Sequence, residues 1–131
     1  MTKLFTTLEE TPAIYREAEH GGFGPIYFRR LWTAHDFQTP IDFIDFTAIG
    51  PGSTIGRHGH EGNEEAYFIV SGSPLMRVQG EERRLSKGDV AVVHSGQWHE
   101  LINDTNEDVE IFVIQVRIPS EGIVKRPTEA G

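Results

Sequence analysis

The sequence predicts a single all-β domain, and three observations support this fold class. A chain of 131 residues is long enough for one domain with a hydrophobic core and too short for two. Twelve isoleucines and nine valines stand against six leucines, and β-branched residues favour strands whereas helical domains prefer leucine and alanine. Short apolar stretches alternate with turns rich in Gly, Pro, Asn and Asp, at spacings typical of a sandwich or barrel.

The predicted strands follow one another with no obvious helix between them. Each is a short stretch bounded by turn residues, of which 50–52 (Gly-Pro-Gly) and 87–88 (Lys-Gly) are examples. Such a succession indicates one closed or sandwiched β domain. We expect nine strands, at residues 26–32, 41–48, 53–60, 65–71, 74–79, 82–85, 89–94, 100–103 and 109–118.

The two ends of the chain lie outside this run of strands. We expect residues 1–24 to form an N-terminal arm or a short helix, because residues 13–18 could form a turn of helix or cross the barrel as an arm. Residues 25–118 would form the barrel. Residues 119–131 are polar and are expected to be a tail or an arm that faces a partner.

Charge and composition exclude several classes of partner. The formal net charge of −8 disfavours a nucleic-acid or anionic-membrane surface. No apolar run approaches the ~20 residues of a membrane span, and no apolar segment follows Lys3 as a secretion signal would require. We therefore expect a cytoplasmic protein. Because the chain has no cysteine, any metal ion must be held by histidine and carboxylate.

Four of the six histidines fall in two short windows that carry the predicted chemistry. His58 and His60 are two residues apart on a predicted strand, so both side chains share one face, with Cα atoms ~6.5 Å apart, and can bind one ion. We expect Glu65 to reach this ion from the neighbouring strand, because paired strands lie ~4.8 Å apart. We expect His99, which follows a tight turn, to come from a third strand and hold the ion from across the barrel.

These windows resemble the two sequence motifs of the cupin superfamily, G(X)5HXH(X)3,4E(X)6G and G(X)5PXG(X)2H(X)3N. The resemblance spans residues 52–103, and one position departs from it, because a histidine replaces the proline of the second motif. This leaves the turn less rigid and places an additional imidazole near the site. The motifs read Gly52-(5)-His58-x-His60-(4)-Glu65-(6)-Gly72 and Gly88-(5)-His94-x-Gly96-(2)-His99-(3)-Asn103.

The resemblance implies the cupin double-stranded β-helix, a jelly-roll barrel that binds one divalent transition metal (Fe, Mn, Ni or Zn). The implied ligands are His58, His60, Glu65 and His99. A buried, unpaired carboxylate costs several kcal/mol, which a metal ion offsets. The alternative is a barrel that has lost its metal.

The implied centre leaves a net charge of about +1, because three neutral imidazoles and one carboxylate bind a 2+ ion. We therefore expect an enzyme that acts on a small polar or anionic organic molecule. Its chemistry would be oxygen-dependent, as in a dioxygenase, or redox-neutral, as in an isomerase or lyase. The fold does not choose between them. The alternative function is a non-catalytic module that binds metal and a small ligand.

Three further residues are candidate catalytic groups. Tyr67 shares strand parity with Glu65, so it either lines the cavity or packs in the core. His94 is either an acid–base group beside the metal or a turn residue that faces water. Gln115 is a lone amide in an apolar strand and points either into a polar cavity or to solvent.

Strand parity also separates three charged residues. Glu64 has the opposite parity to Glu65, so we expect it to be exposed. Arg29 and Arg30 differ in parity, so at most one of them points inward, where it could hold an acidic ligand.

We expect the protein to form a homodimer, because an isolated barrel leaves strand edges exposed. The candidate contact surfaces are an edge strand, residues 4–20 and the polar tail. The other predicted partner is a small-molecule substrate or ligand.

Overall fold

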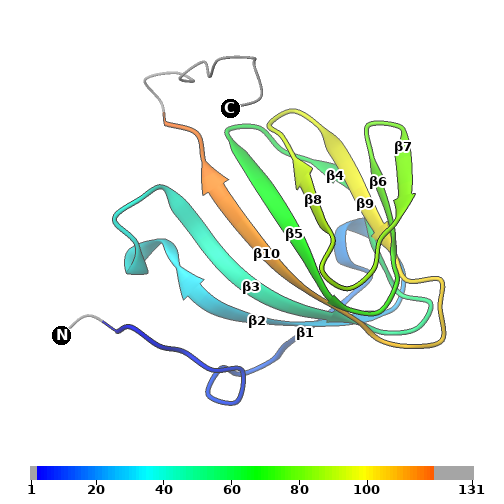
Figure 1. Ribbon diagram of the computed structural model, residues 1–131, viewed down its shortest axis with the longest axis horizontal. Coiled ribbons are helices and arrows are strands. Elements are labelled where there is room, and N and C mark those ends of the chain that lie inside the picture. Colours follow the sequence, from blue (N-terminus) through cyan, green and yellow to red (C-terminus); the bar gives the residue numbers. More distant parts are fainter. Residues whose placement is uncertain (1–2, 120–131) are drawn as a thin grey trace.

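The structure is a computed structural model that describes residues 3–119, and it consists of two antiparallel sheets that face each other (Figure 1). One sheet has six strands in the order β1-β2-β3-β10-β5-β8, and the other has four in the order β4-β9-β6-β7. This arrangement confirms the predicted all-β jelly-roll barrel. The strands are β1 Ile14–Glu17, β2 Pro25–Thr33, β3 Ile41–Ile49, β4 Thr54–Gly59, β5 Asn63–Ser71, β6 Leu75–Val78, β7 Glu81–Arg84, β8 Val90–Val93, β9 Trp98–Ile102 and β10 Val109–Arg117.

All nine expected strands are present, and the N-terminal segment contributes a tenth. Strand β1 pairs with β2, with Tyr15 opposite Tyr27, and forms the edge of the larger sheet. A short 3₁₀ turn, η1 (Glu19–Gly21), follows it, and a second one, η2 (Ala34–Asp36), follows β2. The segment left open between a helix and an arm therefore holds an edge strand and a turn. The predicted tail, apart from Pro119, lies outside the described residues.

The alternation of side chains along the strands builds the core between the sheets. In β10 the side chains of Val109, Ile111 and Val113 are buried, whereas the residues between them are only half-buried. In β5 the inward row contains Tyr67 and Ile69 and begins with the carboxylate of Glu65. Side chains two apart point to the same face of a sheet, so the same period that forms the core brings Glu65 inside the barrel.

The connection between β4 and β5 crosses from one sheet to the other. Only residues 60–62 separate these strands, and Gly62 turns the chain there with a φ of 85°, in the left-handed region. Strand β5 pairs with β10 and β8, while β4 pairs with β9. Two strands joined so closely in sequence therefore lie on opposite sides of the barrel, because closing it over an apolar interior requires the chain to change sheets.

Asn103 anchors the loop between β9 and β10. It is fully buried, and its amide nitrogen donates hydrogen bonds to the carbonyl oxygens of Ile49 at 2.9 Å, Gly50 at 3.0 Å and Glu107 at 2.7 Å. Its Oδ1 accepts hydrogen bonds from the amide and the hydroxyl of Thr105, at 3.1 and 2.6 Å. This motif residue is therefore a structural link between β3 and the loop.

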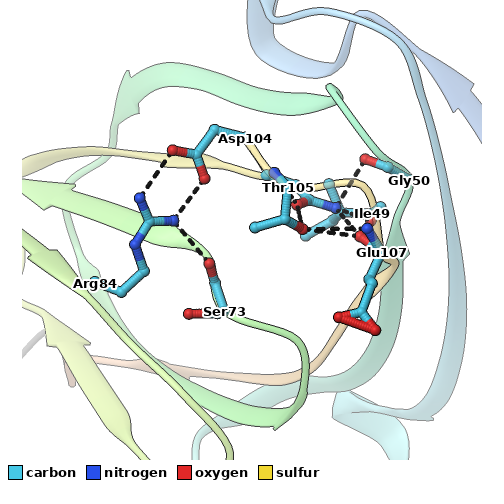
Figure 2. Close-up of polar contacts among 8 residues, drawn as sticks. Ile49, Gly50, Ser73, Arg84, Asp104, Thr105 and Glu107 are labelled. Carbon is cyan, nitrogen blue, oxygen red and sulfur yellow. Dashed lines mark hydrogen bonds and ion pairs between the residues drawn. The ribbon is translucent and has the colours of Figure 1, made fainter.

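An ion pair holds the same loop to the four-stranded sheet. Arg84, at the end of β7, donates hydrogen bonds to Asp104 Oδ2 and to the carbonyl oxygen of Ser73, both at 2.9 Å (Figure 2). Both charged side chains are exposed, and exposed ion pairs of this kind contribute little to stability. The buried amide of Asn103 is consequently the stronger constraint on the loop.

Within residues 3–119, no helix has the length and apolar character needed to cross a membrane. The described helical elements are the two 3₁₀ turns, of three residues each.

We expect Asn103→Ala to lower the free energy of unfolding by about 3 kcal/mol, because it removes a buried amide that donates to three carbonyl oxygens and accepts from Thr105. Urea unfolding measures the change. Asn106→Ala is the matched control on the same loop, where the exposed side chain should alter stability by no more than about 0.5 kcal/mol. Equal losses in the two variants would show that Asn103 is not the anchor.

Candidate metal centre

Three histidines and one glutamate converge inside the barrel. One potential ligand atom from each of His58, His60, Glu65 and His99 lies within 4.8 Å of all the others. The Nε2 atoms of His60 and His99 are both 3.3 Å from Glu65 Oε1. His99 and Glu65 are buried, and the other two side chains are half-buried. The four residues could therefore hold one metal ion.

Strand β4 aims His58 by means of a β-bulge. Its register against β9 shifts between Ile55 and His58, which then lies directly opposite His99. Bulges re-aim side chains in this way. His58 Nδ1 is 2.8 Å from the carbonyl oxygen of Gly56, which can only accept a hydrogen bond. The proton is therefore on Nδ1, and Nε2 is left as the ligand atom.

Two expectations about which strands supply the ligands are wrong. His99 does not come from across the barrel, because β9 is the hydrogen-bonded neighbour of β4. Glu65 does not come from a neighbouring strand of His58, because β5 belongs to the other sheet. Because the chain changes sheets between β4 and β5, Glu65 lies across the barrel from His58, and His99 lies on the strand next to it. Two histidines thus lie side by side on one sheet and face the carboxylate on the other.

The protonation states within the cluster suit metal binding. Burial alone would raise the pKa of Glu65, but the polar contact with His99 and the charges of His60 and His99 outweigh it, so the pKa is lowered. Burial lowers the pKa of His58 to about 4, and charge on His99 and His20 acts in the same direction. At neutral pH the cluster therefore offers an ionised carboxylate and a neutral His58 imidazole, the forms that bind metal ions.

Several buried nitrogens of the cluster have no hydrogen-bond partner. These are Nδ1 and Nε2 of His60 and Nδ1 of His99. His60 Nε2 is close to Glu65, but the direction is not that of a hydrogen bond. Buried polar atoms are normally satisfied, and leaving one unsatisfied costs about 1–3 kcal/mol. Three imidazoles and one carboxylate form a donor set that fits a divalent transition metal.

Tyr67 contacts two members of the cluster. Its hydroxyl donates to Glu65 Oε1 at 3.3 Å and lies 3.1 Å from His99 Nε2. Burial, with the charge of Glu65, raises its pKa well above the ordinary value of 10, so the phenol keeps its proton. The two alternatives for Tyr67 are both realised, since the ring packs in the core and also lines a cavity.

A cavity of about 280 Å³ adjoins the cluster, a volume that suits a small molecule. Its wall includes Arg30, whose Nε and Nη2 each donate to Asp45 at 2.9 Å while the guanidinium lies 4.3 Å from the centre of the Phe43 ring. Arg29 instead donates to the carbonyl oxygen of Leu8 at 2.9 Å. Strand parity allowed at most one of the two arginines to point inward, and Arg30 is the one that lines the cavity, with its side chain 43% exposed.

Gln115 faces the same cavity from β10. It lies opposite Glu65 in the strand register, and its amide nitrogen donates to Asp42 Oδ2 at 2.8 Å. The sequence left open whether this amide points into a polar cavity or to solvent, and in the structure it lines the cavity. The hydrogen bond to Asp42 fixes its orientation.

His94 does not reach the cluster. Its Nδ1 lies 3.0 Å from Glu64 Oε2, and both side chains are largely exposed. His94 lines a separate hollow of about 510 Å³ together with residues of β6, β7 and β8, which contains none of the four clustered residues. This placement agrees with the alternative of a turn residue that faces water and gives no geometric support to a catalytic role.

The sequence reasoning missed His20. Its ring stacks on the ring of His58, with centroids 3.6 Å apart and planes at 8°, and it lines the cavity beside Glu19. The only local signal was the pair Gly21-Gly22, which permits a tight turn. Nothing in the spacing connects residue 20 with residue 58, because only the folded barrel brings them together.

Comparisons with known proteins agree with this fold and cluster. The model of the cupin domain family matches residues 46–115, so the chain belongs to the cupin family. It is 29% identical over 94 residues to the Oxalate-binding protein of Thermotoga maritima, covering 72% of this chain and 78% of that protein. It is 30% identical over 78 residues to the Tetracenomycin polyketide synthase protein TcmJ of Streptomyces glaucescens, covering 60% of this chain and about half, 52%, of that protein.

Solved structures show the same fold at lower identity. A predicted oxalate decarboxylase from Thermotoga maritima superposes with a TM-score of 0.85 at 24% identity, covering 88% of this chain and 100% of that one. The polyketide cyclase RemF from Streptomyces resistomycificus has a TM-score of 0.71 at 17% identity, covering 88% of this chain and 79% of the other.

Proposed function

We propose that this protein is a metal-dependent cupin enzyme that acts on a small polar or anionic organic molecule. The observation that carries the proposal is the convergence of four ligand atoms within 4.8 Å of one another, beside a cavity of about 280 Å³. The similarity to an oxalate-binding protein supports a small acid as the kind of ligand. The ligands would be His58, His60, Glu65 and His99.

A divalent ion (Fe, Mn, Ni or Zn) bound there would supply Lewis-acid chemistry, or electron transfer if it is redox-active. The protein's own groups would orient the substrate and control protons. Tyr67 keeps a proton on its hydroxyl between Glu65 and His99. Arg30 is already neutralised by Asp45, so it would contribute directional N–H groups rather than net positive charge. An anionic substrate would therefore be attracted mainly by the centre itself.

Replacing His99 with alanine should lower the metal affinity at least tenfold, or about 1.4 kcal/mol, because it removes a buried ligand opposite His58. Calorimetric titration of the metal-free variant measures this. The matched control is His94→Ala, since His94 is exposed and paired with Glu64, and its metal content should be nearly unchanged. A site emptied by His94→Ala and retained by His99→Ala would require a different set of ligands.

The competing function is a non-catalytic module that binds metal and a small ligand, which the printed name of the Thermotoga relative favours. Elemental analysis of protein purified without added metal, followed by assays against small carboxylic acids with and without air, separates the two. Turnover only in air supports an oxygenase, and turnover in both conditions supports a redox-neutral isomerase or lyase. If calorimetry detects oxalate binding but oxalate and the other acids all remain chemically unchanged, the result would favour the binding module.

We also infer that the chain forms a homodimer through β1 and the segment before it. Leu4 and Phe5 are 74% and 82% exposed, and Ile14 and Tyr15 on edge strand β1 are exposed as well. A second copy of the chain would cover this apolar surface and the outer edge of β1, which pairs with no further strand among residues 3–119.

Sedimentation equilibrium at micromolar concentration should give the mass of two chains. Phe5→Ser should shift the equilibrium toward one chain, because it removes apolar contact area at the proposed interface. Phe23→Ser is the control, since Phe23 is similarly exposed, at 73%, but lies on the loop between η1 and β2. A single-chain mass for the unmodified protein would contradict the dimer.

A further inference from the structure

The turn η1 carries His20 to the mouth of the candidate metal centre. The imidazoles of His20 and His58 lie face to face, with ring centroids 3.6 Å apart and an angle of 8° between their planes. His58 has a second ring neighbour in His99, at a centroid distance of 4.1 Å and an angle of 54° between the planes. The His58 ring thus contacts both a second candidate ligand and a residue that is not one of the four clustered ligands.

The backbone of this turn is strained. Ala18 has φ 53° and ψ 48°, and His20 has φ 52° and ψ 35°, which is the left-handed region that L-residues with side chains avoid. Such residues persist only where their surroundings enforce the conformation, often at functional sites. The side chain of His20 is 46% exposed, so its own burial does not explain why the chain accepts this conformation.

The turn is attached to the strand that carries His58. Thr54 donates its amide to the carbonyl oxygen of Phe23 at 2.8 Å and accepts the Phe23 amide on its hydroxyl at 2.8 Å. A Cβ on Gly56 would overlap the carbonyl oxygen of His20, and a Cβ on Gly22 would overlap Thr54. The two glycines allow this close approach, so η1 lies packed directly against β4.

We propose that His20 is a positioning residue of the metal centre, which covers the open face of the His58 imidazole and keeps its ligand nitrogen aimed at the shared ion. This inference rests on the proposed metal site. Because His20 offers no atom to the set within 4.8 Å, it acts through His58 rather than as a ligand. The left-handed backbone of the turn is then explained, because it places the His20 ring against this face of His58.

Titration of metal-free protein with Co(II) tests the proposal, because the visible absorption bands report both the affinity and the ligand set. His20→Ala removes the stack and should weaken Co(II) binding by about tenfold, as loss of a ligand's supporting partner does. His20→Phe restores a flat ring without ring nitrogens and should bind within about twofold of the unmodified protein. At saturation all variants should show the same spectrum.

The chain offers a matched control in His35→Ala, since His35 lies in the other 3₁₀ turn, η2, and is exposed. Its affinity for Co(II) should be unchanged, and thermal unfolding shows that each variant is folded. Equal binding by His20→Ala and the unmodified protein would overturn the role of His20. A folded His20→Phe as weak as His20→Ala, or with a different spectrum, would show that a ring nitrogen is needed and would also overturn positioning by stacking.

A second readout needs no metal. The ring signals of His58 in the nuclear magnetic resonance spectrum of metal-free protein should move in His20→Ala and stay in place in His35→Ala, because only the first variant removes the stacked ring. Unmoved signals in His20→Ala would overturn the proposal. Failure of the unmodified protein to take up Co(II) is a different result, because it would overturn the metal centre itself.

Discussion

The buried carboxylate of Glu65 is the constraint on which the rest of the site depends. Placing an ionised carboxylate inside an apolar barrel costs several kcal/mol unless it is paired and hydrogen-bonded. Here the Nε2 atoms of His60 and His99 each lie 3.3 Å from Glu65 Oε1, and the Tyr67 hydroxyl donates a hydrogen bond to the same oxygen. Their nitrogens are nevertheless not all satisfied, since three buried imidazole atoms of His60 and His99 have no hydrogen-bond partner. A cation shared by the cluster would pair with the carboxylate and would take up one nitrogen of each imidazole.

The surrounding fold keeps these groups in register. The crossing from β4 to β5 puts the carboxylate on one sheet and His58 with His99 on the other, so closing the barrel brings them together. The bulge in β4 aims His58, and the glycine at position 56 lets the N-terminal turn approach it. Asn103, buried in the loop after β9, holds the far end of the strand that carries His99. The contacts that hold these strands and loops together therefore also position the side chains of the site.

The sequence was most informative where a local pattern is enough. Composition and turn spacing predicted the all-β fold, strand parity placed Tyr67 on the same face as Glu65, and the motif spacing identified the four residues that cluster. It could not show which sheet each strand joins, so the roles expected for Glu65 and His99 were exchanged. The N-terminal turn was hidden for the same reason, because the stack of His20 on His58 joins residues far apart in sequence through tertiary packing.

One metal ion bound between the two sheets should be visible by anomalous X-ray diffraction from crystals of the protein purified without added metal. We expect a single anomalous peak at the absorption edge of a first-row transition metal, within about 2.0–2.3 Å of nitrogens of His58, His60 and His99 and an oxygen of Glu65. A crystal soaked with Mn(II) or Co(II) should show the peak at the same place. A metal peak bound elsewhere, or none at this cluster after soaking, would show that these four residues do not form a metal centre.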